Sequence, residues 1–192
     1  MKIYLFRHGE TYYNKNNIFT GRKDSKLTPK GVQDAREISR KLKNLKIDIA
    51  IYTKLSRSKE TLKIILKHHS ECKKIIVDDR MIEGSYGSLS GKKYSTIIKK
   101  YGIEKYNTWL GNYYIRPPKG ENYADIEKRV KKFTVWLEKY VKENQVNVVI
   151  SAHGNSIRMF RKIMENLSIK ETEKLKIAHV KIFTYDIPNN HK

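Results

Sequence analysis

Two His-Gly pairs, each directly after a short apolar run, are the residues of this sequence best suited to chemistry. His8 follows residues 2–6, and His153 follows residues 147–150. Both runs are rich in β-branched or aromatic residues, which predicts strands. Open α/β sheets bind ligands beyond the carboxyl ends of their parallel strands. The two histidines, far apart in the chain, are therefore expected to meet at one edge of a sheet.

Two arginines are expected at the same edge. Arg7 stands directly before His8, and Arg57 lies just beyond a second predicted strand, in the first turn of the next helix. Two imidazoles and two guanidiniums suit a phosphate, because one neutral His can attack phosphorus while the other groups hold the equatorial oxygens. A single His after a strand is as often a hydrogen-bonded core residue. The joint arrangement argues against that alternative here.

Metal-dependent chemistry and a nucleotide loop are not predicted. Catalytic zinc usually takes three protein ligands, whereas Cys72, His68 and His69 lie together in a segment that looks like an exposed helix end. The glycines form no G-x-x-x-x-G-K-[ST] loop. We therefore expect no metal ligands and no cofactor-binding residues.

Short apolar segments alternate with amphipathic ones along the chain, which is the pattern of βαβ units. Thr28 as N-cap and Pro29 at the first helical position mark the start of the first long helix. We expect a three-layer α/β sandwich with a mostly parallel central sheet flanked by helices. The predicted strands are residues 2–6, 47–52, 74–77, 147–150 and an edge strand at 177–185, and the predicted helices are 29–44, 55–67, 122–144 and 156–166.

A polar, glycine-rich passage interrupts this alternation. It covers about residues 84–120 and is expected to hold one or two short helices as a small lid over one edge of the sheet. At 192 residues the whole chain, residues 1–192, is expected to form a single domain that contains this insertion.

Composition indicates a cytoplasmic protein. No stretch approaches the roughly 20 apolar residues of a membrane helix, so no membrane partner is expected. The first residues turn polar too soon for a signal peptide. Cys72 is the one cysteine and can form no internal disulfide, which agrees with a reducing compartment.

The formal net charge of +21 would concentrate phosphorylated anions and would equally attract nucleic acid. The lysines are scattered through every predicted element, which indicates a biased composition and makes nucleic acid an unlikely partner. Aromatic residues interleaved with basic ones could stack bases, but they are expected to line the lid instead. These residues are Tyr101, Tyr106, Trp109, Tyr113 and Tyr114.

The chain resembles the phosphoglycerate mutase-like histidine phosphatase superfamily over almost its whole length. The opening signature is Leu-Phe-Arg-His-Gly-Glu-Thr at residues 5–11, followed by Asn14, Phe19-Thr20-Gly21, Asp24, Leu27-Thr28 and Gly31. Later matches are Leu55-Ser56-Arg57 with Thr61, Glu83 with Tyr86-Gly87, Pro117-Pro118 with Gly120-Glu121, and the run from Ile150 to Arg158 that contains His153.

This resemblance implies a role for each matched residue. His8 would become phosphorylated, Arg7, Arg57 and His153 would form the phosphate pocket, and Glu83 would donate the proton to the leaving group. A carboxyl can do so only if part of it stays protonated near the working pH. The alternative for Glu83 is a surface carboxylate or a helix cap. The matched positions expected to face the substrate are Asn14, Thr20, Gly21, Tyr86 and Asn155.

The resemblance leaves two activities open. The mutase branch typically carries cationic residues that hold a carboxylate and a second phosphate, and the matching positions here are Gly84, Tyr94, Leu110 and Gly111. Lys92, Lys93 or Arg116 could substitute for them. The run Pro-Pro-Lys-Gly-Glu-Asn at residues 117–122 looks more like the phosphatase branch, whereas Ser-Ala-His-Gly-Asn-Ser at 151–156 is closer to the mutase wording.

We therefore expect a phosphatase that hydrolyses small phosphomonoesters through a phosphohistidine, with a small phosphorylated anion as its partner and no cofactor. The alternative is a glycolytic phosphoglycerate mutase that depends on 2,3-bisphosphoglycerate as its cofactor. A basic nucleic-acid-binding protein or an inactive scaffold is a remote third reading, and a homo-oligomer is left open.

Overall fold

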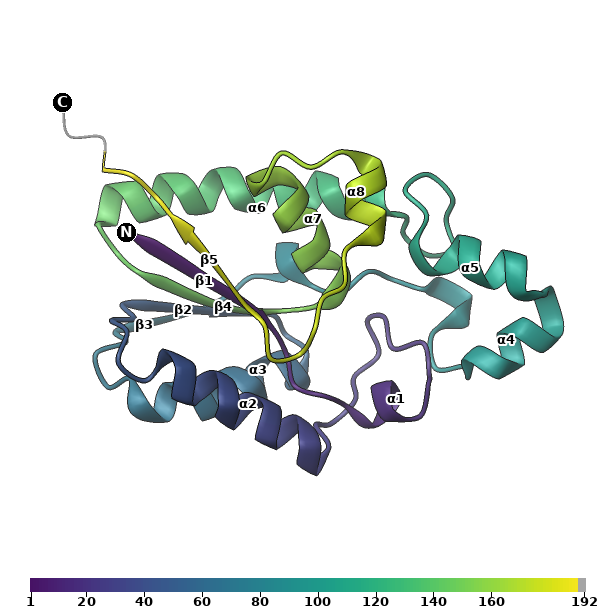
Figure 1. Ribbon diagram of the computed structural model, residues 1–192, viewed down its shortest axis with the longest axis horizontal. Helices are drawn as coiled ribbons and strands as arrows, with labels where there is room; N and C mark the ends of the chain where they lie inside the picture. The colour runs from purple at the N-terminus through teal and green to yellow at the C-terminus, as the bar shows by residue number, and fades with distance from the viewer. Residues whose placement is uncertain (190–192) are drawn as a thin grey trace.

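The computed structural model describes residues 1–189 and contains a five-stranded sheet between two helical layers (Figure 1). The strand order is β3-β2-β4-β1-β5, and β5 is antiparallel to β1 while the other neighbours are parallel. This confirms the expected three-layer α/β sandwich with a mostly parallel sheet. The strands are β1 (Lys2–Arg7), β2 (Ile49–Tyr52), β3 (Lys74–Val77), β4 (Val148–Ala152) and β5 (Ile182–Asp186).

Side chains of the central strands alternate between two cores because successive residues point to opposite faces of a sheet. Ile3 and Leu5 of β1 belong to one buried cluster, and Tyr4 and Phe6 belong to the other. The first cluster packs against α6 (Tyr123–Asn144) and α7 (Gly154–Met164), and the second against α2 (Pro29–Leu42) and α3 (Ser56–Ile65). Burial on both faces explains why these strands are almost wholly apolar.

Capping residues set the ends of the long helices. Thr28 accepts a hydrogen bond from the Gly31 amide and places Pro29 at the first position of α2, as predicted. Asn122 caps α6 through a reciprocal pair of bonds with Asp125, so the helix begins at Tyr123. At its other end Gln145 adopts φ 53°, which stops the helix.

Several predicted boundaries differ from the structure by a few residues. The helix predicted at residues 55–67 ends at Ile65 and continues as the 3-10 turn η1 (Leu66–His68). The strand predicted at 177–185 is β5, which begins only at Ile182. Two short helices were not predicted from the sequence, namely α1 (Tyr12–Lys15) and α8 (Ile169–Lys174).

The lid, residues 84–120, projects to one side beyond the carboxyl ends of the parallel strands (Figure 1). It contains η3 (Gly87–Leu89), α4 (Tyr94–Tyr101) and α5 (Ile103–Gly111), and the 3-10 turn η2 (Asp79–Met81) precedes it. Its own small core forms around Phe19, whose ring lies 4.6 Å from Tyr94 and 4.9 Å from Tyr86 between centroids. Tyr101, Tyr106 and Trp109 join this core, as expected for residues that line the lid.

Candidate active site

His8 lies at the carboxyl end of β1 and is 2% exposed. Its Nε2 atom accepts a hydrogen bond from Arg57 Nε at 3.2 Å, and its Nδ1 atom lies 2.7 Å from the carbonyl oxygen of Gly9. A guanidinium N–H can only donate, so Nε2 carries a lone pair and the ring proton resides on Nδ1. The backbone thus fixes the tautomer that leaves Nε2 as a nucleophile.

The surroundings of His8 keep it neutral. Burial lowers its pKa well below the ordinary value of 6.5, and the charges of Arg57 and Arg7 lower it further. A neutral imidazole is the form that can attack phosphorus.

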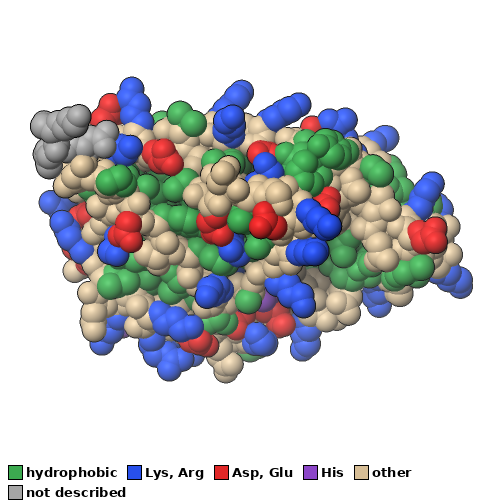
Figure 2. Space-filling view, turned by 45° about the horizontal axis from the view of Figure 1, so that its top comes forward, with side chains coloured by type: hydrophobic (Ala, Val, Ile, Leu, Met, Phe, Trp, Pro, Cys, Tyr) green, Lys and Arg blue, Asp and Glu red, His purple; other side chains and the backbone are tan. Residues whose placement is uncertain are grey.

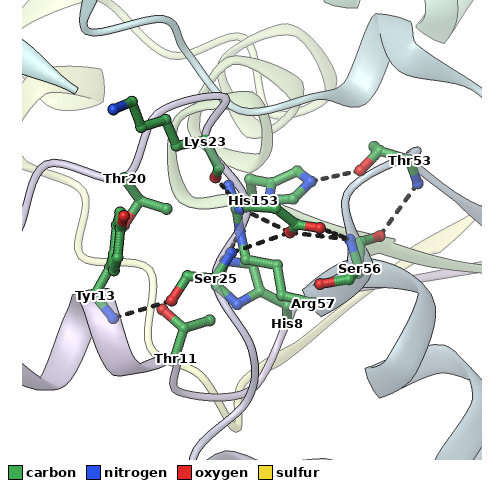
Figure 3. A network of polar contacts seen from close by, with 12 residues as sticks. His8, Thr11, Tyr13, Thr20, Lys23, Ser25, Thr53, Ser56, Arg57 and His153 are labelled. Carbon is green, nitrogen blue, oxygen red and sulfur yellow. Dashed lines mark hydrogen bonds and ion pairs between the residues drawn. The ribbon is translucent and has the colours of Figure 1, made fainter. Parts of the chain in front are cut away.

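Arg57 lies in the first turn of α3 and is 1% exposed, with its guanidinium anchored on the loop after α1 (Figure 3). Its two η nitrogens donate to the carbonyl oxygens of Lys23 at 2.9 Å and Gly21 at 2.8 Å. Burial lowers its pKa to about 10, so it stays charged at neutral pH. Gly21 has φ +52°, and a Cβ there would lie 2.9 Å from Ser90 Oγ, so the loop requires glycine at this point.

His153 follows β4 and faces His8, with 5.2 Å between the ring centroids. Its Nε2 atom is hydrogen-bonded to the hydroxyl of Thr53 at 2.7 Å (Figure 3). Its Nδ1 atom is buried and has no hydrogen-bond partner among residues 1–189. Burial lowers the pKa of His153 well below 6.5, with further lowering by Arg57 and Arg7. An unpartnered buried nitrogen beside His8 is a position where a ligand oxygen could bind.

Arg7 and Glu83 converge on the first turn of α7. Arg7 Nη1 donates to the Ile177 carbonyl at 3.0 Å, while its Nε is buried without a partner in the described chain. Glu83 is 8% exposed, and its Oε1 atom accepts from the amides of Gly84 at 2.8 Å and Asn155 at 3.0 Å. A Cβ at Gly154 would lie 3.6 Å from Glu83 Oε2 and 3.8 Å from Arg7 Cζ, so both groups approach one point.

The five predicted substrate positions divide into three groups. Tyr86 and Asn155 line a cavity beside Glu83, and Asn155 Nδ2 donates to the Tyr86 hydroxyl at 3.3 Å. Thr20 and Gly21 belong to the loop that anchors Arg57. The side-chain oxygen of Asn14 is used locally, because it accepts from the amide and hydroxyl of Thr11 in the cap of α1.

The cavity has a volume of about 430 Å³ and extends from Arg7 to the α5 residues of the lid. Polar and charged groups dominate its wall. The residues that line it are Arg7, Glu83, Tyr86, Asn107, Leu110, Gly111, Tyr123, Gly154, Asn155, Arg158, Glu173 and Ile177.

The segment between α8 and β5 contributes contacts that the sequence analysis missed. The carbonyl of Leu175 accepts from Arg158 Nη2 at 2.9 Å, and His179 Nδ1 donates to the His8 carbonyl at 2.7 Å. The carbonyl of Ile177 accepts from Arg7. Residues 175, 177 and 179 of one segment thus hydrogen-bond to two side chains and one backbone carbonyl of the site. Only its last part, from Ile177 on, lies within the predicted edge strand at 177–185.

Thr53 was also missed as a support of the site, and Thr61 was matched to the family without being given a role. Thr61 Oγ1 accepts from the Gly9 amide at 3.1 Å, directly beside His8. Thr53 follows β2, and the rule that selected the two histidines, a polar residue after a buried strand, would have found it.

No group of three or more metal-ligating side chains lies together in residues 1–189. His69 is buried and its Nδ1 atom lies 2.8 Å from Glu71 Oε1, so the expectation of an exposed segment there is wrong for this residue. Within the same residues, no helix is long and apolar enough to cross a membrane.

Comparison with known sequences identifies relatives along nearly the full chain. The profile of the histidine phosphatase superfamily (branch 1) matches residues 3–192. A 2,3-bisphosphoglycerate-dependent phosphoglycerate mutase of Parvibaculum lavamentivorans is 34% identical and covers 96% of this chain and 90% of the relative. A phosphoglycerate mutase of Schizosaccharomyces pombe is also 34% identical, covering 92% and 85%.

Solved structures share the fold. A mycobacterial glucosyl-3-phosphoglycerate phosphatase in complex with VO3 has a TM-score of 0.84 at 20% identity, covering 95% of this chain and 90% of that one. A phosphoglycerate mutase from Bacillus anthracis has a TM-score of 0.78 at 22% identity, covering 96% and 86%. With the sequence match and the fold in agreement, the chain belongs to branch 1 of the histidine phosphatase superfamily and is a phosphoryl-transfer enzyme.

Proposed function

We propose that this protein is a phosphatase that hydrolyses small phosphomonoesters through a phosphohistidine on His8. The neutral ring and the lone pair on Nε2, which points to Arg57, support its role as the nucleophile. Arg7, Arg57 and His153 surround that atom and would hold the phosphate oxygens as charge spreads over them. Two buried donors, Arg57 and His153, and the partly buried Arg7 can supply this stabilisation without a metal ion.

The reaction proceeds in two steps. The Nε2 lone pair of His8 forms a bond to phosphorus as the bond to the ester oxygen breaks, and Glu83 gives a proton to the departing alkoxide. Water then attacks the phosphohistidine and Glu83 takes a proton from it, which releases inorganic phosphate and frees His8. Two backbone amides hold the Oε1 atom of Glu83, and this fixes the carboxyl beside Arg7.

The balance of charge in the cavity is the observation that favours hydrolysis over isomerisation. Arg7 and Arg158 are its two lysine or arginine side chains, and Glu83 and Glu173 are its two carboxylates. A mutase must hold a carboxylate and two phosphates while its intermediate turns round, which needs a surplus of positive charge. Arg57 lies beside His8 and does not line this cavity, so the cavity wall itself offers no such surplus.

At the positions matched to the cationic residues of the mutase branch, this chain has uncharged residues that serve packing or line the wall. Leu110 and Gly111 line the cavity wall, and Tyr94 packs in the aromatic core of the lid. A Cβ at Gly84 would lie 2.7 Å from Ile126 Cδ1, so a long side chain there would have to displace the core. Each position therefore lacks a cation that could grip a second anionic group.

The three basic residues that could substitute for these cations do not line the cavity. Lys92 and Lys93 are exposed, and Arg116 forms an ion pair with Asp125. Their charges are directed to solvent or to a local carboxylate.

A phosphoglycerate mutase is the second candidate, favoured by the names of the relatives that are 33–35% identical. It would require 2,3-bisphosphoglycerate as its cofactor. A cytoplasmic location, a single domain and the state of oligomerisation stay predictions from the sequence.

One assay separates the two candidates. The protein is incubated with 3-phosphoglycerate, with and without 2,3-bisphosphoglycerate, and both inorganic phosphate and 2-phosphoglycerate are measured. We expect phosphate release to dominate in both conditions and to vanish in His8→Ala. Isomerisation that outruns phosphate release by about tenfold, a difference of about 1.4 kcal/mol in barrier height, would favour the mutase.

A further inference from the structure

We infer that the cavity selects uncharged or cationic leaving groups over carboxylated ones, and that Glu173 is the residue that makes this choice. The inference rests on the proposed phosphatase function and names its substrate class: phosphate esters of polyols or amino alcohols. It concerns the end of the cavity where the alcohol part of the ester would lie.

Glu173 is held in place at the cavity wall by the backbone. It belongs to α8, and its Oε1 atom accepts a hydrogen bond from the Tyr113 amide at 3.1 Å. Tyr113 follows α5, so this bond ties the carboxylate to the outgoing end of the lid. Leu110 and Asn107 of α5 line the cavity beside it. The carboxylate is thus fixed at the lid side of the space that a leaving group would fill.

The negative charge of Glu173 is not neutralised by a neighbour. No Lys, Arg or His nitrogen of residues 1–189 lies within 4.0 Å of its carboxylate. An amide donor stabilises a carboxylate but leaves its full charge in place. Glu173 is exposed, so water screens part of this charge, and a ligand in the cavity meets the remainder.

Arg158 faces the same cavity but is engaged with the protein. Its Nη1 atom donates to Asn155 Oδ1 at 2.7 Å and its Nη2 atom to the Leu175 carbonyl at 2.9 Å. Its guanidinium also lies 5.2 Å from the centre of the Tyr123 ring. Its Nε atom is buried and has no partner among residues 1–189, so a carboxylate on the ligand would have to compete with two existing acceptors for the η nitrogens.

Arg7 is the other cation of the cavity, and it faces the phosphate. Once a phosphate binds there, the alcohol part of the ester lies between Glu83 and Glu173. A carboxylate on that alcohol would be repelled by Glu173, whereas a hydroxyl or an ammonium would find an acceptor. The amide of Asn107 and the hydroxyl of Tyr86 add further partners for hydroxyl groups.

The test compares three phosphate esters whose alcohols differ mainly in charge: phosphoethanolamine, glycerol 3-phosphate and 3-phosphoglycerate. We expect kcat/KM for glycerol 3-phosphate to exceed that for 3-phosphoglycerate by about tenfold at low salt, with phosphoethanolamine at least equal to glycerol 3-phosphate. The last two esters differ by a hydroxymethyl group in place of a carboxylate, so their ratio reports charge.

Glu173→Gln keeps an acceptor for the Tyr113 amide and removes only the charge, so it should reduce this ratio about fivefold. Glu173→Lys should reverse the preference. Glu60→Gln is the matched control. Glu60 is exposed on α3, and its substitution changes the net charge by the same amount away from the cavity. It should leave both the ratio and the turnover of p-nitrophenyl phosphate unchanged.

A wild-type preference for 3-phosphoglycerate, or the same ratio in Glu173→Gln and wild type, would overturn the inference. Release of phosphate in the same assay would still support the phosphatase function. No phosphate release from any of the three esters would overturn the phosphatase function, and the inference with it.

Discussion

The surroundings of three histidines at the site keep their rings uncharged. His8 must be neutral to attack phosphorus, and burial lowers its pKa well below 6.5. The same cause acts on His153, and burial lowers the pKa of His179 to about 4. Each ring also has a hydrogen bond that orients it, so the site keeps three uncharged imidazoles within contact of two arginines. This arrangement holds only while the rings stay unprotonated.

The first prediction concerns the pH dependence of stability. Below pH 6.5 the three histidines bind protons in the unfolded chain but not in the folded one, so the free energy of unfolding falls as the pH falls. Each contributes a slope of up to about 1.4 kcal/mol per pH unit between 6.5 and its folded pKa. We expect the urea midpoint to drop clearly from pH 7 to pH 5.

His179→Gln isolates one of these protons. Its amide can still donate to the His8 carbonyl, but it cannot titrate, so its stability should fall less steeply over the same pH range than that of wild type. Carboxylates that titrate there are common to both proteins and cancel in the comparison. Parallel slopes would show that His179 binds its proton equally well in the folded and the unfolded protein.

At the scale of elements, the sequence predicted the parts of the fold that follow from local patterns. Cap residues such as Thr28 and the apolar runs of β1 and β4 carry their own signal, and the edge rule brought His8, Arg57 and His153 together. Local patterns could not predict which backbone groups of a connecting segment contact side chains of distant elements. The carbonyls of Leu175 and Ile177 serve Arg158 and Arg7, and any residue type can supply a carbonyl.

Glu121 joins three elements and was predicted only as part of a phosphatase-like run. Its Oε2 atom accepts from the Ser85 amide at 2.8 Å, and its own amide donates to the Ser85 carbonyl at the same distance. Its Oε1 atom accepts from Arg22 at 2.8 Å and Arg129 at 3.3 Å. Glu121 therefore fastens both ends of the lid to the loop after α1 and to α6.

The second prediction is that Glu121→Gln loosens the lid. Removing the charge weakens the bonds to Arg22 and Arg129, two ion pairs that are only partly exposed, and should cost about 1–3 kcal/mol of local stability. Amides of residues 84–111 should exchange hydrogen faster, and KM should rise several-fold. Glu104→Gln, an exposed change on α5, is the control. Exchange that rises equally in the sheet would indicate global destabilisation instead.

At the scale of the whole molecule, the net charge of +21 is spread rather than gathered. Figure 2 shows Lys and Arg side chains over the whole visible face, interspersed with other residues. The active-site cavity itself is balanced, with two arginines and two glutamates. The charge therefore belongs to the surface as a whole, where it attracts anions from a distance and where like charges repel one another.

The last prediction follows from this repulsion. The 41 Lys and Arg residues exceed the 20 Asp and Glu residues, so ion pairs can compensate fewer than half of the cations, and the rest repel one another. Compact folding brings these charges closer than they are in the unfolded chain, and salt screens them over about 30 Å at 0.01 M but about 10 Å at 0.1 M. Raising NaCl from 10 to 300 mM should therefore raise Tm by several degrees, measured by calorimetry. Arg57→Ala should show the same rise, because it alters the phosphate pocket and leaves the surface charge almost unchanged, which separates screening from chloride binding at the site. A Tm that stays level or falls with salt would mean that the repulsion persists in the unfolded chain to the same degree.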